Sequence, residues 1–210
     1  MLEPGAAAFY GVRPSWARLW QQAIAEGRDW YYIDNAFFDL DREQRFRVAK
    51  NCVQLSSFRR RDYPPFRGTI APWRQDGEHI VVCAQSDEFM RTVIGYQEHW
   101  ADTVCRTLRR YTTRPIVRTS KGSKASLARA LLNAWALVAY SSAAANEALI
   151  AGVPVFALGV CAASQMALTD LSRIESPWLP DGRAQWAAAV AAHQWTLAEL
   201  AQGHAWRAVN

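Results

Sequence analysis

The segment 135–158, WALVAYSSAAANEALIAGVPVFAL, constrains the fold more than any other part of the sequence. Residues 135–140 form an apolar run of about the length of a buried strand, and Ser141 or Ser142 can cap a helix expected over 143–151. A Gly-Val-Pro sequence ends that helix, and a second apolar run follows over 155–158. Such a unit joins two parallel strands through a right-handed crossover, so the segment predicts an α/β fold.

The polar residues inside this apolar segment indicate a ligand site at the start of its helix. Free backbone N–H groups of residues 143–145 would favour an anion, and the small side chains leave room for a phosphate. Glu147 could accept hydrogen bonds from both hydroxyls of a ribose, with Asn146 beside it. The segment therefore predicts a nucleotide diphosphate at the carboxyl end of the strand. The alternative is an ordinary crossover whose Glu and Asn lie on the surface.

Three motifs of the second half resemble a known family. They are the Ser-Ser, Glu and Gly-Val-Pro-Val-Phe residues of segment 135–158, the sequence RPIVR over 114–118, and the sequence SQMALTDLSRIE over 164–175. Together they resemble the donor half of GT-B glycosyltransferases, and more narrowly small phage and bacterial transferases distantly related to capsule-polysaccharide glycosyltransferases. The similarity extends from about Ile80 to the C-terminus. It implies a compact GT-B-like α/β fold, in which two Rossmann-like halves with parallel sheets face a central cleft.

The resemblance divides the chain into an acceptor-side half, residues 1–78, and a nucleotide-sugar-binding half, residues 79–210. The first half has the matching order of elements: an apolar strand over 6–12, a helix with Pro14 in its first turn, and a strand over 30–33. In many GT-B proteins the terminal helices pack back against the first half, and the same is expected here. A Thr-Leu-Ala-Glu capping box over 196–199 predicts the start of one such helix.

The resemblance also implies which residues bind the donor, a nucleotide sugar for which a UDP-sugar is expected. In related transferases the loop after the strand over 115–117 faces the donor phosphates, so its basic residues are expected to neutralise the diphosphate. The alternative for this loop is an ordinary basic turn. No cofactor is expected beside this co-substrate. The expected donor-binding residues are Arg118, Lys121, Ser141, Ser142, Asn146, Glu147 and Ser164.

Two aspartates are candidates for the general base that takes the proton of the acceptor hydroxyl. Asp34 follows the strand over 30–33, in the half opposite the donor, where the acceptor should enter. Asp87 follows the strand expected over 79–84 and would also lie at the cleft of a GT-B fold. Each has a structural alternative: Asp34 could cap the next turn, and Asp87 could cap a long helix over 88–111. Asp34 is the preferred catalytic residue.

The loop over 56–79 carries the strongest signal for nucleic acid. Arginines that can neutralise phosphates alternate with rings that can stack on bases, and the net charge of the chain is +5. The alternative is a solvated loop anchored by buried aromatic residues. With the phage-like resemblance, this loop makes a 5-hydroxymethylpyrimidine of DNA, such as 5-hydroxymethylcytosine, the preferred acceptor, and a capsular or other carbohydrate the main rival. The expected nucleic-acid contacts are Arg59, Arg60, Arg61, Arg67 and Trp73.

Several further features bear on the class of protein. Asp39-Leu40-Asp41 matches the metal-binding DxD pattern of other glycosyltransferases, but a GT-B-like reaction needs no metal, so no metal site is expected. No apolar stretch has the length of a bilayer span, and residues 1–8 lack the basic region of a secretory signal. These observations predict a cytoplasmic protein, located in the host cytoplasm if it is phage-encoded. The four scattered cysteines are expected to be reduced thiols. A non-catalytic nucleic-acid-binding module and a sugar-nucleotide epimerase are the alternative functions.

Overall fold

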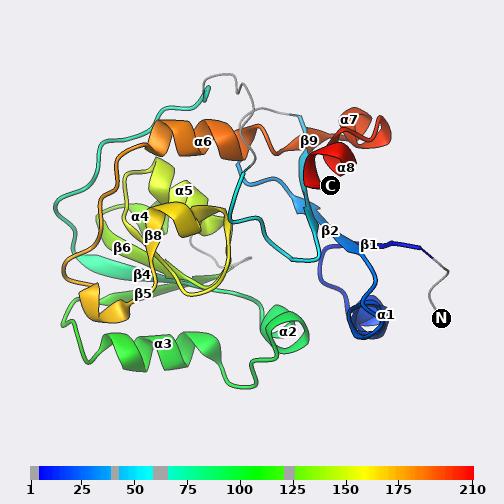
Figure 1. Cartoon of the computed structure of the whole chain (residues 1–210). Coiled ribbons are helices and arrows are strands. Elements are labelled where there is room, and N and C mark those ends of the chain that lie inside the picture. The colour runs from blue at the N-terminus through cyan, green and yellow to red at the C-terminus, as the bar shows by residue number, and fades with distance from the viewer. Residues whose placement is uncertain (1–4, 39–42, 59–65, 121–125) are drawn as a thin grey trace.

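The chain forms two β-sheets, each covered by helices (Figure 1). The computed structural model describes residues 5–38, 43–58, 66–120 and 126–210. Sheet A contains the strands of the first half and one short strand near the C-terminus, and sheet B contains the remaining strands. The α/β class expected from the sequence is confirmed.

Sheet B has five parallel strands in the order β5-β4-β6-β7-β8. Because β5 and β6 lie on opposite sides of β4, the strand order reverses between β4 and β6. In open α/β sheets, ligands bind outside the carboxyl ends of the strands at such a reversal. The five strands are β4 (His79–Ala84), β5 (Ile116–Ser120), β6 (Ala134–Ala139), β7 (Val155–Ala157) and β8 (Ala167–Leu168).

Helices cover both faces of sheet B. Alternate residues of β4 enter two separate cores, Val81 on one face and Ile80 and Val82 on the other, because successive side chains of a strand point to opposite faces. Burial on both faces is also why these strands are almost wholly apolar. The first core contains α4 (Leu127–Leu131), α5 (Ala144–Ile150), η2 (Ala162–Met166) and α6 (Arg183–Ala191), and the second contains α2 (Asp87–Phe89), η1 (Met90–Ile94), α3 (Trp100–Leu108) and η3 (Leu171–Arg173).

The segment 135–158 folds as the predicted strand, helix and strand, which are β6, α5 and β7. Gly152 has φ +76° and follows the helix as its left-handed C′ residue. The Val153 N–H donates to the Ala148 carbonyl at 2.8 Å and the Gly152 N–H to the Leu149 carbonyl at 3.3 Å. This hydrogen-bond pair is the Schellman motif, which satisfies two of the last carbonyls of the helix.

The prediction of one long helix over 88–111 is wrong. The structure has three shorter elements there, α2, the π-helical turn η1, and α3. Gly95 ends the first pair of elements with φ +76°, and the Tyr96 N–H closes the turn on the Met90 carbonyl at 2.8 Å. A glycine that adopts the left-handed region ends a helix even where an apolar stripe continues beyond it.

Sheet A is mixed, which corrects the parallel sheet expected in the first half. Its order is β1-β2-β3-β9, and only the β1–β2 pair, joined by helix α1 (Pro14–Ala25), is parallel. The short connection after β2 brings β3 back antiparallel to it. The strands are β1 (Ala7–Tyr10), β2 (Trp30–Asn35), β3 (Arg45–Lys50) and β9 (Trp195–Thr196).

The C-terminal segment packs on sheet A. Strand β9 pairs with β3, and helices α7 (Leu197–Ala201) and α8 (His204–Val209) follow it (Figure 1). The capping box forms as predicted: Thr196 accepts the Glu199 N–H at 3.2 Å, and Glu199 accepts the Thr196 N–H at 2.7 Å. The rings of Tyr31 and Trp206 pack edge to face, with 4.9 Å between their centroids. Sheet A thus contains residues from both 1–78 and 79–210, and that domain division stays a prediction.

The loop between β3 and β4 is anchored on the second half. Phe58, Phe66 and Trp73 pack against the core between sheet B and α5. The Ala71 N–H donates to the Ile150 carbonyl at 2.9 Å. Residues 51–58 and 66–78 contain no helix or strand, as the prolines and glycines predict. Among the described residues, no helix combines the length and hydrophobicity needed to cross a bilayer.

Candidate functional site

A cavity of about 880 Å³ lies where the carboxyl ends of strands from both sheets meet. Sheet A contributes the β1–α1 turn, the end of β2, one residue of β3 and the start of the loop after it. Sheet B contributes the ends of β4, β5 and β6 and the helix starts that follow them. The cavity therefore occupies the strand reversal of sheet B, the place where α/β sheets bind ligands.

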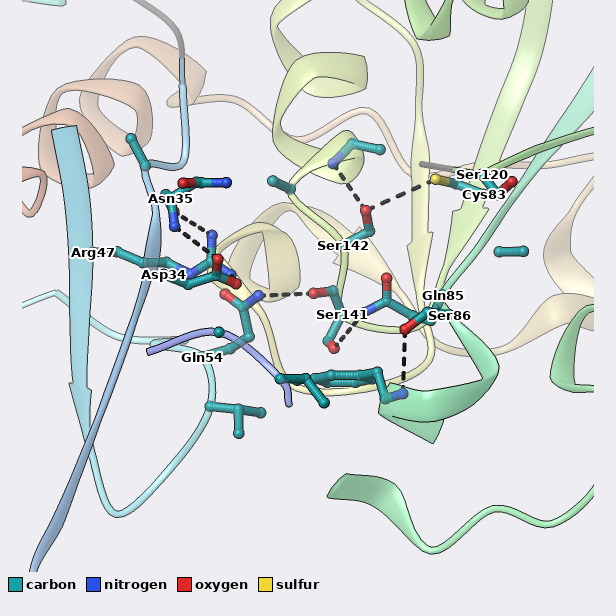
Figure 2. Close-up of a pocket in the computed structure, with 18 of the residues that line it drawn as sticks. Asp34, Asn35, Arg47, Gln54, Cys83, Gln85, Ser86, Ser120, Ser141 and Ser142 are labelled. Atoms are coloured by element: carbon teal, nitrogen blue, oxygen red, sulfur yellow. Dashed lines mark hydrogen bonds and ion pairs between the residues drawn. The ribbon is translucent and has the colours of Figure 1, made fainter. Parts of the chain in front are cut away.

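The wall formed by sheet B is rich in hydroxyl groups. These come from the carboxyl ends of three neighbouring parallel strands, β5, β4 and β6, and from the helix starts that follow them (Figure 2). Small alanines between them leave space for a ligand to approach the backbone. The hydroxyl residues of this wall are Ser86, Thr119, Ser120, Ser126, Ser141 and Ser142.

The hydroxyl of Ser142 is oriented by its neighbours. Its Oγ accepts the Ala144 N–H at 3.2 Å and the Cys83 thiol at 3.8 Å. Burial raises the pKa of the Cys83 thiol, and Glu147 adds to this, while the bond to Ser142 lowers it. The thiol therefore stays protonated and donating at neutral pH. With both contacts made to its oxygen, Ser142 keeps its own proton as a donor for a ligand oxygen.

The expectation of free N–H groups over residues 143–145, in the turn that begins α5, is wrong for two of the three residues. The Ala144 N–H is used by the Ser142 hydroxyl, and the Ala145 N–H donates to the Ser142 carbonyl at 3.1 Å. The helix itself has only seven residues. Because an anion site at a helix start depends on unpaired N–H groups, the hydroxyls of this turn are better placed to bind phosphate than its backbone.

Ser141 is held from both sides of the cavity. Gln54, which follows β3 and is 6% exposed, donates from Nε2 to the Ser141 carbonyl at 2.8 Å. Gln85, at the end of β4, donates from Nε2 to the Ser141 Oγ at 3.3 Å. Figure 2 shows the two amides approaching Ser141 from opposite directions. The end of β6 is therefore fixed to the loop of the first half as well as to its own sheet.

The wall formed by sheet A carries the acidic and basic groups. Asp34 lies within β2 rather than after it, and its Oδ2 accepts Arg47 Nη2 at 2.7 Å and the Tyr32 hydroxyl at 3.2 Å. Its Oδ1 accepts the Asn35 N–H at 2.8 Å. Burial, followed by the charge of Asp34, raises the pKa of Tyr32, so its hydroxyl remains a donor across the physiological range. Asp34 thus lines the cavity as a carboxylate with three donors.

Four of the predicted site residues meet in this cavity: Asp34, Ser141, Ser142 and Glu147. They come from both sheets, as a donor and an acceptor facing each other would require. Glu147 is exposed on the first turns of α5 and lines the cavity wall. The cavity therefore contains the preferred base and the central part of the expected donor site.

Asp87 and Arg118 are among the predicted residues that do not line the cavity. Asp87 is exposed, and its Oδ1 lies 3.4 Å from His99 Nδ1. The N-cap of α2 is Ser86, whose Oγ accepts the Phe89 N–H at 3.2 Å. The alternative that Asp87 caps a helix is therefore wrong. Arg118 pairs with Asp102 of α3 at 2.6 Å. That ion pair directs the guanidinium to the α3 side of the strand.

Asn146 and Ser164 serve the packing around α5 and β7. Asn146 is 2% exposed and its Oδ1 is buried without a hydrogen-bond partner. The Ser164 Oγ accepts the Cys161 N–H at 2.9 Å and closes the turn of η2. Neither residue is among those that line the cavity.

The residues expected to contact nucleic acid are described in part. Trp73 donates from Nε1 to the Pro180 carbonyl at 3.2 Å, and the guanidinium of Arg183 stacks 3.7 Å from its ring centroid. These contacts anchor the loop on the second half. Arg67 is exposed. The remaining expected contacts, Arg59, Arg60 and Arg61, lie outside the described residues, as do Lys121, Asp39 and Asp41.

The described residues contain no candidate metal site and no disulfide. No three of their His, Cys, Asp or Glu side chains come together as potential metal ligands. All four cysteines are free thiols, and Cys83 and Cys161 are buried. The expectation that no metal is needed stays a prediction.

Sequence reasoning missed the basic and amide groups of the cavity, Arg13, Arg47 and Gln54. The alternation of residues over 45–54 favours a strand with its basic residues outward, but Arg47 is 7% exposed. The sequence feature that could have indicated its burial is the opposite charge of Asp34. That charge becomes informative only when the antiparallel pairing of β2 and β3, which places the two residues opposite each other, is known.

The fold was then compared with known proteins. No protein-family model and no curated protein matches the sequence. Among solved structures, the chain is similar to Thermosulfurimonas dismutans KpsC, a beta Kdo 2,4 transferase, with a TM-score of 0.51 and 12% identity, over 93% of this chain and 85% of that chain. At this identity the likeness shows the fold alone: the chain shares its α/β architecture with that transferase.

Proposed function

We propose that this protein is a glycosyltransferase that moves a sugar from a nucleotide-sugar donor to a hydroxyl acceptor. One observation carries the proposal: a single cavity places Asp34 of sheet A opposite Ser141, Ser142 and Glu147 of sheet B. The likeness of the fold to a Kdo transferase supports the same class of reaction. A distant fold likeness would not suffice alone, because one fold serves many reactions.

In the proposed reaction, the acceptor O–H gives its proton to Asp34. The acceptor oxygen forms a bond to the anomeric carbon of the donor, and the bond from that carbon to the phosphate oxygen breaks. The bonding electrons leave with the nucleotide. A base must be within hydrogen-bond reach of the proton it takes, and Asp34 meets the first requirement by lining the cavity.

The donor is proposed to lie against the hydroxyl wall. Ser142 keeps a proton to donate to a phosphate oxygen, and Glu147 can accept both ribose hydroxyls. Arg13 lies in the lining and is exposed, so it can add positive charge near the leaving group. Arg118 can contribute only if its pair with Asp102 opens, and Lys121 remains a proposed contact in the segment after β5.

The proposed acceptor has two candidate classes. A carbohydrate hydroxyl is supported by the likeness to a Kdo transferase and by the packing of Phe58, Phe66 and Trp73, which uses these rings as core anchors. A hydroxymethylated pyrimidine of DNA is supported by the arginines of the same loop, of which Arg67 is exposed, and by the net charge of +5. Both classes present a primary or secondary hydroxyl to the same base.

The test is a transfer assay read by mass spectrometry. The protein is incubated with a panel of nucleotide sugars and either hydroxymethylated DNA or an oligosaccharide acceptor. The expected result is one added sugar mass on one acceptor, with turnover lowered about 10²–10⁴-fold in Asp34→Asn while donor binding is kept. Absence of transfer and of donor-induced thermal stabilisation for every donor would refute the proposal. DNA binding without any nucleotide effect would favour the non-catalytic module, and a changed donor sugar without acceptor would reveal an epimerase.

A further inference from the structure

Arg47 is a buried cation at the wall of the cavity. It lies on β3, is 7% exposed, and lines the cavity together with Asp34. Its strand runs antiparallel to β2, and the register pairs Arg47 with Asp34 directly. Side chains of residues directly opposite each other on two strands lie close enough to interact.

The guanidinium divides its contacts between the side chain and the backbone of β2. Nη2 donates to Asp34 Oδ2 at 2.7 Å, and Nη1 donates to the Asn35 carbonyl at 2.6 Å. One rigid, planar group therefore fixes the carboxylate and the last peptide of the strand relative to each other. Figure 2 shows Arg47, Asp34 and Asn35 together on the sheet A side of the cavity.

Stability is a poor explanation for this arrangement. The Nε of Arg47 is buried and has no hydrogen-bond partner, which costs free energy. Buried ion pairs often contribute no more to stability than apolar residues of the same size. What the pair does supply is a fixed direction for the carboxylate: Oδ2 holds two side-chain donors, and Oδ1 holds a single backbone donor.

We propose that Arg47 is a positioning residue that holds Asp34 in the orientation needed to take the acceptor proton. This inference rests on the proposed glycosyl transfer. An acceptor hydroxyl needs a base oxygen within about 3 Å, and an error of 1 Å in such a position can cost about 100-fold in rate. Arg47 acts through Asp34, without contacting either substrate.

The test is a double-mutant cycle with Arg47→Met, Asp34→Asn and the double variant. Arg47→Met is expected to lower kcat about 100-fold while the dissociation constant of the donor stays unchanged. In the Asp34→Asn background, Arg47→Met is expected to lower kcat by less than about threefold, because its route of action is already gone. Losses that multiply in the double variant, or weaker donor binding in Arg47→Met, would overturn the inference and make Arg47 a substrate contact.

Matched variants separate positioning from charge and from folding. Arg45→Met changes the same residue type on the same strand, where Arg45 pairs with Glu43 at 3.0 Å outside the cavity lining, and it should keep wild-type turnover. Arg47→Lys keeps the charge but cannot form both contacts with one planar group, so it should recover only part of kcat. If Arg47→Met does not fold, Arg47→Lys replaces it in the cycle. Millimolar guanidinium should raise the turnover of Arg47→Ala and leave that of Asp34→Asn unchanged.

The wild-type protein distinguishes failure of this inference from failure of the proposed function. If wild-type protein transfers no sugar from any donor, the proposed function fails. If it transfers sugar but the two substitutions act independently, only the role of Arg47 fails.

Discussion

Gly152 offers a sharp test of the packing that supports the cavity. It follows α5, whose first turns line the cavity, and its φ of +76° lies in the left-handed region. A Cβ at this position would lie 2.1 Å from the Pro72 carbonyl oxygen and 3.1 Å from the Pro72 carbonyl carbon. The loop is held at this distance because the Arg74 N–H donates to the Gly152 carbonyl at 2.8 Å.

Gly152→Ala is therefore expected to destabilise the protein through two separate effects. A non-glycine residue in the left-handed region costs about 1–2 kcal/mol. A methyl group forced against backbone atoms adds about 1–3 kcal/mol, because the neighbouring chain must move. The free energy of unfolding should fall by roughly 2–5 kcal/mol in total.

Gly95→Ala is the matched control. Gly95 has the same φ of +76°, but a Cβ there would have no atom within 4 Å, so only the cost of about 1–2 kcal/mol applies. Urea denaturation followed by the fluorescence of the ten tryptophans measures both variants. Equal losses in the two variants would refute the reasoning, since the loop at Pro72 would then yield to a side chain at no cost.

Four further predictions concern the site and its partners. Glu147→Ala should weaken donor binding by about 1–3 kcal/mol in calorimetry, and unchanged affinity in the folded variant would move the ribose site elsewhere. Asp87→Asn should keep turnover and change stability by less than about 0.5 kcal/mol, because Asp87 is exposed and does not cap α2, so a dead variant would reverse the choice of base. If the loop contacts DNA, neutralising Arg59, Arg60 and Arg61 should reduce the slope of log affinity against log salt concentration by roughly one unit per lost phosphate contact. Binding of the nucleotide sugar should stay intact. An unchanged slope and an unchanged DNA affinity would exclude the contact. Activity should also survive a chelator, and rescue by manganese after inactivation would contradict metal independence.

The parts of the fold that sequence predicted are those whose signals lie close together in the chain. The segment 135–158 contains the signals for its first strand, its helix end and its second strand close together in the chain. The Schellman motif at Gly152 likewise needs only neighbouring residues. The capping box over 196–199 is equally local. Such signals are sufficient because each satisfies backbone groups of its own element.

The parts that sequence missed depend on partners distant in the chain. Strand β3 pairs with β2 on one side and with β9 on the other, and no local pattern distinguishes this from a parallel sheet. The burial of Arg47 follows from that pairing, because it places the guanidinium beside Asp34. A basic residue in an alternating strand is expected to be solvated, and only an opposite charge on the neighbouring strand makes its burial tolerable.

The start of α5 lies within one residue of the predicted position, but the expectation of unpaired N–H groups there is wrong for a different reason. Three small residues after two serines suggested unpaired N–H groups, but the same serine that could bind a ligand also reaches the nearest N–H. Serine side chains compete for local backbone groups, so a serine pair at a helix start predicts a cap as readily as a phosphate site. In the proposed donor site, the hydroxyls of this turn therefore replace its backbone N–H groups as the donors to phosphate.

In the proposed reaction, the hydroxyl wall and the wall formed by sheet A act as one site only while the distance between them is kept, and Gln54 is one of the residues that join them. Its amide reaches from the loop after β3 to the Ser141 carbonyl, at the end of the strand that carries the proposed donor site. Because this hydrogen bond is buried, breaking it would leave a donor and an acceptor without partners, which costs more than the bond itself contributes. The link therefore resists widening of the cavity, and the distance from Asp34 to the hydroxyl wall is held by the same loop that follows Arg47.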